Sequence, residues 1–163
     1  MIYHRTFHSL ARMGSLLFLL AALFATSCAQ LPVATAVVGP VTMRLLGKGA
    51  FSGQVTARTE VLRDQPAWAK FWDQHATTAR GATNLPTVDF AKELVLVATL
   101  GRKNSGGYSI EITKVEAEPK ALKVFVRRKS PPPGGMSIQA LTAPFHFVAV
   151  PATKLPVVFV DEN

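Results

Sequence analysis

One apolar segment constrains the fold of this chain more than any other. Residues 93–100, ELVLVATL, are almost continuously hydrophobic. A strand buried on both faces has this composition, whereas a strand with one solvated face alternates apolar and polar residues. We therefore expect residues 93–100 to form a central strand of a sheet. The neighbouring strands must come from the rest of a 163-residue chain, a length that suits one domain and is too short for two full cores.

Other segments alternate with a period of two, which is typical of half-buried strands. Residues 108–115, for example, begin YSIEI, with an apolar residue at every second position. Gly47, Gly49 and Gly53 are expected to form a turn, or a bulge, early in the domain. The same pattern predicts further strands at residues 41–46, 54–63, 121–129, 145–150 and 156–160.

A single amphipathic helix is predicted over about residues 64–76. Asp64 is a favoured N-cap because its carboxylate can accept from amides of the first turn, and Pro66 falls where a missing N–H costs nothing. We expect His75 to be a helix-end residue rather than a catalyst, and a protonated imidazole would suit the helix C-terminus. An apolar stripe at helical spacing is expected to pack against the sheet; it consists of Trp68, Phe71, Trp72 and His75.

These segments together define the expected fold class. We predict an α+β domain of about seven mostly antiparallel strands, which form a sheet or a sandwich with the helix packed on it.

The first 27 residues have the composition of a secretory signal. Arg5 and Arg12 precede an apolar stretch, and the region contains no acidic residue. The stretch, residues 16–25, is shorter than the roughly 20 residues that span a bilayer. Residues 1–27 are therefore expected to be a signal peptide. Residues 28–40 contain no charge and are expected to be a tether, followed by one domain at residues 41–163.

Cys28, the only cysteine of the chain, comes directly after the predicted signal peptide and three residues after the end of its apolar stretch. Its position is typical of a bacterial lipoprotein, in which the thiol carries acyl chains such as palmitate and becomes the mature N-terminus. Ala25 stands where leucine is usual in that motif, and Ala25 with Ser27 would also suit an ordinary signal peptidase. We predict a lipid-anchored cell-envelope protein. Ala29, rather than aspartate, favours the periplasmic side of the outer membrane if the host has two membranes. A soluble secreted protein and an uncleaved anchor are the alternatives.

No catalytic residue, metal site or cofactor is predicted. A lone cysteine excludes a disulfide scaffold and a zinc site with several thiolates. His75 and His146 lack the spacing of a metal-binding pair, and no G-x-S-x-G motif is present. Residues 101–107 lack the ending of a phosphate-binding loop. His146 alternates with two phenylalanines, so we expect it on the opposite face of its strand, satisfied or solvated.

The formal net charge of +8 permits anionic partners but names none. The densest basic cluster, residues 127–129, is expected to be a solvated strand end. Export from the cytoplasm argues against a nucleic-acid partner.

A succession of features between residues 87 and 113 carries a family resemblance. Asp89 and Phe90 precede a lysine–acid pair, Lys92 and Glu93, and the buried strand follows. A glycine-led turn ending Gly-Gly-Tyr and an alternating strand come next, and a Pro/Gly loop later leads to QALTAPFHFVAVP. In order and spacing, the segment from residue 87 to about 160 resembles the C-terminal domain of the protease-complex subunit PrcB, found in exported bacterial proteins.

The resemblance implies a non-enzymatic role, because the named family member is a lipoprotein that associates with an exported serine-type protease. We predict an accessory subunit that binds another exported protein, such as a protease or its complex. Two alternatives remain open. One is a loop-wedge protease inhibitor, by analogy with chagasin-type loops, and the other is a cell-wall or polysaccharide-binding module.

Two loops form the predicted partner-binding surface, because loops on a rigid sheet commonly carry binding. Glycines let a partner's backbone approach closely, and prolines lower the entropy lost on docking. A hairpin turn with Gly106 or Gly107 at positive φ would explain the first loop equally well. The candidate residues are Lys103, Asn104, Ser105, Gly106, Gly107 and Tyr108 in the first loop, and Pro133, Gly134, Gly135 and Met136 in the second.

Overall fold

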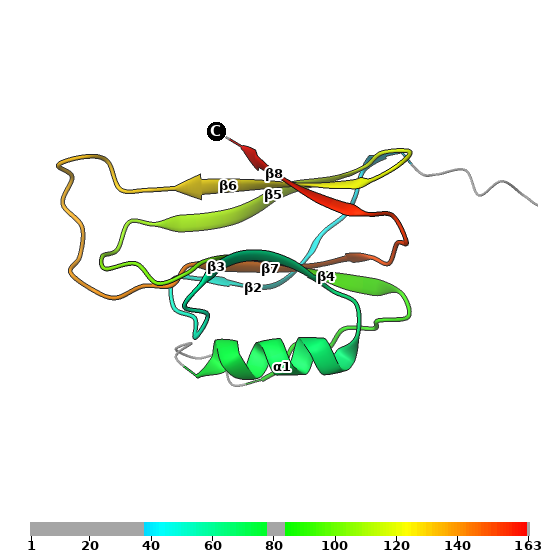
Figure 1. Cartoon of the computed structure of the whole chain (residues 1–163), viewed down its shortest axis with the longest axis horizontal. Helices are drawn as coiled ribbons and strands as arrows, with labels where there is room; N and C mark the ends of the chain where they lie inside the picture. Colours follow the sequence, from blue (N-terminus) through cyan, green and yellow to red (C-terminus); the bar gives the residue numbers. More distant parts are fainter. Residues whose placement is uncertain (1–37, 78–83, 163) are drawn as a thin grey trace, which may run out of the picture. The chain divides into compact units, whose positions relative to one another are not determined.

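Eight strands and one helix make up the part of the chain that the computed structural model describes, residues 38–77 and 84–162. Figure 1 shows two stacked sheets with the helix on the outer face of one of them. The first sheet has the order β1-β5-β6-β8, with β1 (Gly39–Pro40), β5 (Ser109–Ala117), β6 (Leu122–Lys129) and β8 (Val157–Glu162). The second has the order β2-β7-β4-β3, with β2 (Arg44–Gly49), β7 (Phe145–Pro151), β4 (Glu93–Leu100) and β3 (Ala57–Leu62).

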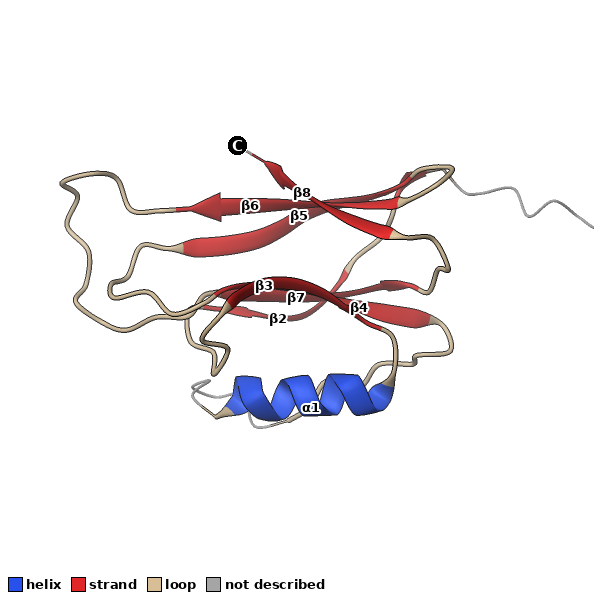
Figure 2. Cartoon of the chain, viewed as in Figure 1, coloured by secondary structure: helices blue, strands red, loops and turns tan. Residues whose placement is uncertain are grey.

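The predicted fold class is confirmed. Neighbouring strands are antiparallel except for β6 and β8, which pair in parallel. Figure 2 shows the layers as sheet, sheet and helix α1 (Gln65–Ala76). The strand beyond the seven expected is β1, in which Gly39 and Pro40, the last residues of the predicted tether, pair with Ala117 and Glu116. The predicted signal peptide and Cys28 lie outside the described residues.

Strand β4 is buried on both faces, as its composition predicts. Leu94, Leu96 and Ala98 pack between the two sheets, together with apolar side chains of β5, β6 and β7. Val95 and Val97 point to the other side and pack under the helix. All seven residues from 94 to 100 are buried. The second sheet is therefore the middle layer of the molecule, and β4 carries parts of both cores.

Helix α1 forms as its sequence predicts. The carboxylate of Asp64 accepts a hydrogen bond from the Ala67 amide at 2.8 Å, which caps the first turn. The apolar stripe is buried against β4 and β7, where the Phe147 ring lies 5.1 Å from that of Phe71 and 6.1 Å from that of Trp68. The indole N–H of Trp68 donates to the Pro86 carbonyl at 3.0 Å, so the polar group of this buried ring is satisfied.

Two glycines predicted to form a turn belong to strand β2 instead. Gly47 and Gly49 pair with Phe147 and Phe145 of β7, and the register shifts between Leu45 and Gly47, which is the expected bulge. A Cβ atom on Gly49 would lie 2.9 Å from the Phe145 ring. The glycines therefore make room for the aromatic rings, and the turn lies at residues 50–56.

His146 lies on β7 with its side chain toward the first sheet. It is buried, and its Nδ1 accepts a hydrogen bond from the backbone N–H of Ile112 on β5 at 2.8 Å. The expected satisfied histidine is thus found, and it joins the two sheets. Burial and, to a lesser extent, the nearby Lys48 lower the pKa of His146. Within residues 38–77 and 84–162, no helix has the length and hydrophobicity that crossing a membrane requires.

Replacing Phe147 by alanine should lower the free energy of unfolding by about 3–5 kcal/mol, because the ring is fully buried among Trp68, Phe71 and Trp72. Urea unfolding followed by tryptophan fluorescence measures this change. Val158→Ala, at a position of β8 that is 44% exposed, is the control and should change stability by less than about 1 kcal/mol. Equal effects of the two substitutions would contradict the packing described above.

Candidate binding surface at the loop end of the sandwich

Three connections meet at one end of the sandwich. They are residues 50–56 between β2 and β3, residues 101–108 between β4 and β5, and residues 130–144 between β6 and β7. We call these three segments the loop end; they lie at the left of Figure 1, beside the C-terminal end of α1. Both predicted partner-binding loops belong to it, and the structure adds residues 50–56.

The first predicted loop is hydrogen-bonded to the connection that carries the second, at residues 138–142, which follow the predicted Pro133–Met136. Lys103 and Thr142 exchange backbone hydrogen bonds of 2.8 and 3.0 Å. The Gly106 amide donates to the Ile138 carbonyl at 2.9 Å, and the Thr142 hydroxyl donates to the Ser105 carbonyl at 2.9 Å. These bonds hold residues 103–106 against residues 138–142, so the loops form one surface.

The glycines of the first loop serve this pairing. Gly107 has the predicted positive φ, 82°, but β4 and β5 lie in different sheets, so the loop is a connection between the sheets and the hairpin interpretation is wrong. Gly106 is buried, and a Cβ atom there would lie 2.5 Å from the Ile138 side chain. The missing side chain at Gly106 therefore leaves room for Ile138 of the β6–β7 connection, whereas Asn104 and residues 132–136 remain exposed.

Large apolar side chains are concentrated on the loop end. In the described part of the chain, seven large hydrophobic residues are exposed, and four of them lie here. A cluster of exposed apolar side chains on a soluble surface commonly marks an interaction site. The four are Val55, Met136, Ile138 and Leu141, with exposed fractions of 56%, 105%, 69% and 63%.

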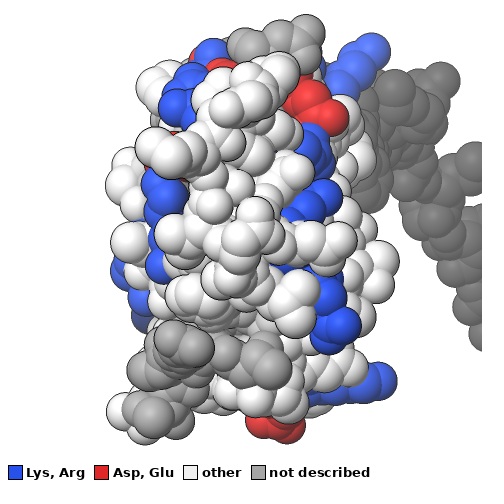
Figure 3. All heavy atoms as spheres, turned by 90° about the vertical axis from the view of Figure 1, so that its left-hand side faces the viewer, with Lys and Arg blue, Asp and Glu red and all other residues white. Residues whose placement is uncertain are grey.

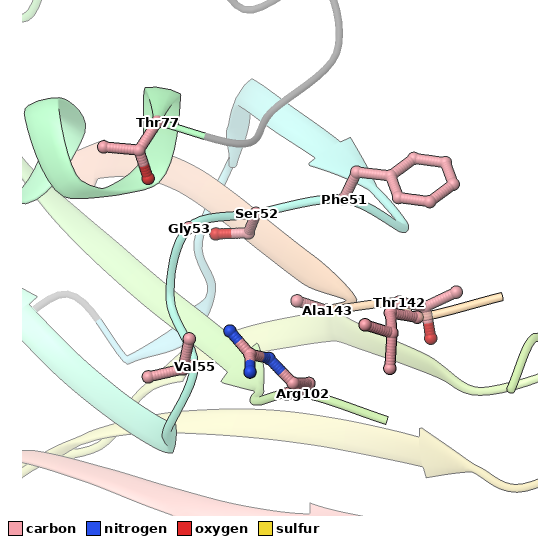
Figure 4. A pocket seen from close by; sticks show the side chains of 9 residues that line it. Phe51, Ser52, Gly53, Val55, Thr77, Arg102, Thr142 and Ala143 are labelled. Carbon is pink, nitrogen blue, oxygen red and sulfur yellow. The ribbon is translucent and has the colours of Figure 1, made fainter. Parts of the chain in front are cut away.

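A groove of about 430 Å³ lies between the three segments. Figure 4 shows Arg102 in this groove, between Val55 and the Thr142–Ala143 segment. The Arg102 amide donates to the Val55 carbonyl at 3.0 Å, which fixes the backbone from which the side chain extends. The lining residues are Phe51, Ser52, Gly53, Val55, Thr77, Arg102, Leu141, Thr142 and Ala143.

The charge of the loop end is entirely positive. Its three segments contain Arg102 and Lys103 and no acidic residue. The Lys103 ammonium lies 5.4 Å from the centre of the Tyr108 ring, a cation–π contact. Figure 3, which faces this end, shows a broad uncharged surface with Lys and Arg along its sides and a few Asp and Glu atoms at its upper and lower edges. Such a surface favours partners that present apolar and acidic groups.

A buried hydrogen bond fixes the groove to the helix. Ser52 Oγ lies 2.8 Å from His75 Nδ1, and the same oxygen accepts from the Gln54 amide at 3.1 Å. The Gly53 amide donates to the His75 carbonyl at 2.9 Å. A Cβ atom on Gly53 would lie 1.8 Å from the Gln74 carbonyl oxygen, so only glycine allows the loop to approach the helix this closely.

The expectation of a protonated His75 is wrong. Its ring is fully buried beside Trp72, Phe145 and Phe147. Burial lowers the pKa of His75 to about 4, so the imidazole is neutral and can accept the Ser52 hydroxyl hydrogen. Ser52 and His75 are 23 residues apart and belong to no motif, which is why sequence patterns did not pair them.

The predicted basic cluster lies exposed at the end of β6. Arg127 pairs with Glu162 at 3.0 Å and Arg128 pairs with Asp161, both on β8. Among the described residues, no group of His, Cys, Asp and Glu side chains is arranged to hold a metal ion.

Comparison with known proteins confirms the predicted family resemblance. Residues 94–151 match the family described as PrcB C-terminal. This stretch runs from β4 to β7 and includes two of the three loop-end segments. No curated protein and no solved structure matches the chain.

The neutral state of His75 predicts a dependence of stability on pH. An unfolded histidine has a pKa near 6.5, whereas His75 in the folded chain has a pKa of about 4. Between these values the unfolded chain binds more protons, so stability falls as the pH falls from about 6.5 to 4, by about 2.5 kcal/mol. The lowered pKa of His146 adds to the loss in the same direction.

Urea unfolding across this pH range measures the loss, and NMR titration of the imidazole protons assigns it. We expect the His75 ring signals to stay constant down to about pH 5. A His75 titration centred near 6.5, or stability that does not change over the range, would contradict the assignment.

Proposed function

We propose that this protein is a non-enzymatic accessory subunit of the cell envelope that binds another exported protein through the loop end. The observation that carries the proposal is the coincidence, in three loop segments at one end of the sandwich, of exposed apolar side chains with two basic residues and no acidic residue. The match of residues 94–151 to the PrcB C-terminal family supports an accessory role, and the name of that family makes a protease complex the first partner to test.

The composition of the surface supports a protein partner. Protein interfaces are enriched in methionine, aromatic residues and arginine at their centres, with polar residues at the rim. Met136 and Leu141 would supply apolar contact, and Arg102 would supply a charged hydrogen-bond donor. The hydrogen bonds between residues 103–106 and 138–142 hold the surface in place before binding, so less conformational entropy is lost on association.

The anchor is proposed from the sequence. Acylation of Cys28 would leave residues 29–37 between the membrane and the first described residues. Two or three acyl chains would hold the protein at the membrane stably, whereas one would bind reversibly.

Replacing Cys28 by serine should move the protein from the membrane fraction to the soluble exported fraction, because serine offers no thiol for acylation. Mass spectrometry of the mature wild-type protein should show an acylated N-terminal Cys28. Ala25→Leu, which strengthens the lipoprotein motif, is the matched control and should stay at the membrane. An unmodified N-terminus at Cys28 or Ala29 would instead establish a soluble secreted protein.

Site-specific photo-crosslinking in host cells tests the proposed surface. A photoreactive residue at fully exposed Met136 should form an adduct with one exported protein. The same residue at Lys120, an exposed position in the turn between β5 and β6, is the control at the opposite end and should form no such adduct. Mass spectrometry of the adduct identifies the partner.

Other outcomes would overturn the proposal. Adducts of equal yield at both positions, or none at Met136, would exclude the loop end as the specific surface. An adduct with cell-wall polymer would favour the polysaccharide-binding alternative. A captured protease whose activity the purified domain abolishes would favour the loop-wedge inhibitor.

A further inference from the structure

We propose that the groove binds an extended segment of the partner protein that carries an acidic side chain, with the carboxylate paired to Arg102 and apolar residues on either side of it. This inference rests on the proposed function and gives the chemistry of the contact. It follows from what the groove lining leaves unsatisfied.

Arg102 is the polar side chain of the lining that has no partner. Each of the three hydroxyl groups in the lining is already engaged within the described chain. Ser52 Oγ bonds with His75 and with the Gln54 amide, Thr77 donates to the Gln74 carbonyl at 2.9 Å, and Thr142 donates to the Ser105 carbonyl. Within the described residues, no acceptor contacts the Arg102 guanidinium. The polar requirement on a ligand is therefore set by one guanidinium.

A carboxylate is the ligand group that best matches the Arg102 guanidinium. The planar guanidinium offers two parallel N–H donors that match the two oxygens of a carboxylate. The lining contains no acidic side chain that could compete for Arg102, and the next residue in the chain, Lys103, places its ammonium over the Tyr108 ring. One cation suits a single negative charge, whereas a phosphate dianion would call for a second.

Exposed apolar side chains beside Arg102 determine the apolar part of the proposed ligand. Val55 and Leu141 line the groove and are both more than half exposed, so each would gain burial when a chain is bound. Figure 4 places Arg102 between Val55 and the segment that follows Leu141. Because the groove is open to solvent, a chain can enter and leave it, and apolar residues before and after the carboxylate both find a contact.

Selection from a random peptide library tests this assignment. The purified domain, residues 38–163, is screened against two displays of the same seven-residue library. In one display the peptide is flanked on both sides by linker, and in the other it ends in a free carboxyl group. Circular dichroism first verifies that the domain is folded; if it is not, the full chain in detergent is used. We expect the internal library to yield peptides with Asp or Glu flanked by apolar residues.

Variants of the domain then test the role of Arg102. For the selected peptides, Arg102→Gln should weaken binding at least tenfold, and replacing the peptide's acid by its amide should weaken it equally. Arg102→Lys should recover part of the affinity, because it keeps the charge and loses the paired donors. Lys120→Gln removes one positive charge at the opposite end and should leave binding unchanged. Because Arg102 is exposed and unpartnered in the described chain, its variants should keep the wild-type melting temperature.

Three results of the peptide selection would overturn the inference. The first is that neither library yields enriched peptides. The others are enriched peptides whose binding Arg102→Gln leaves unchanged, and enrichment only of peptides with a free terminal carboxyl group. The proposed function is tested separately by the photo-crosslinking, and one crosslinking result would also overturn the inference. If the Met136 adduct forms at full yield in the Arg102→Gln variant, the groove inference is wrong and the loop end remains the partner surface.

Discussion

The burial of β4 on both faces is the constraint on which the rest of the structure depends. A strand with no solvated face needs apolar layers above and below it, and the chain supplies one as a second sheet and the other as a helix. Strand β7, its neighbour, divides its side chains in the same way. Phe145 and Phe147 pack under α1, and Val148 and Val150 pack between the sheets. The middle sheet thus holds the two cores together.

The position of the candidate binding surface follows from this arrangement. Because β4 and β7 are antiparallel neighbours, the end of β4 and the start of β7 lie at the same edge of the sheet. The connections from β4 to β5 and from β6 to β7 therefore emerge side by side, and their backbones can pair at Lys103 and Thr142. The turn after β2 joins them because β2 pairs with β7. A surface assembled in this way combines residues that are far apart in the sequence.

The sequence patterns predicted the regular elements well and the groove only in part. Alternation and helical spacing report burial directly, so β4, β5 and α1 were found close to their observed bounds. The glycines of β2 were assigned to a turn because a glycine that makes room for a ring looks the same in sequence as one that turns the chain. The protonation of His75 could not be predicted either, because it depends on aromatic rings of β7 that lie some 70 residues away.

For the surface, sequence reasoning identified two loops and missed Arg102, Val55 and Leu141. Single exposed apolar residues carry no periodic signal, and Arg102 is one of many cations in a basic chain. One signal was available. The three segments contain no acidic residue, although acids are spread through the strands and the helix. Only the topology shows that these three segments are neighbours. Their lack of acidic residues indicates a candidate surface only when the segments are known to lie together.

The two connections that cross between the sheets at the loop end have a consequence for stability. Residues 101–108 and 130–144 each pass from one sheet to the other, and their mutual hydrogen bonds clasp the sandwich at this end. The connections from β1 to β2 and from β7 to β8 also pass between the sheets, so the loop-end hydrogen bonds act on sheets that are already joined elsewhere. We expect the groove geometry and the folded state to be lost together in one cooperative transition, and a ligand bound in the groove would then stabilise the folded state by mass action.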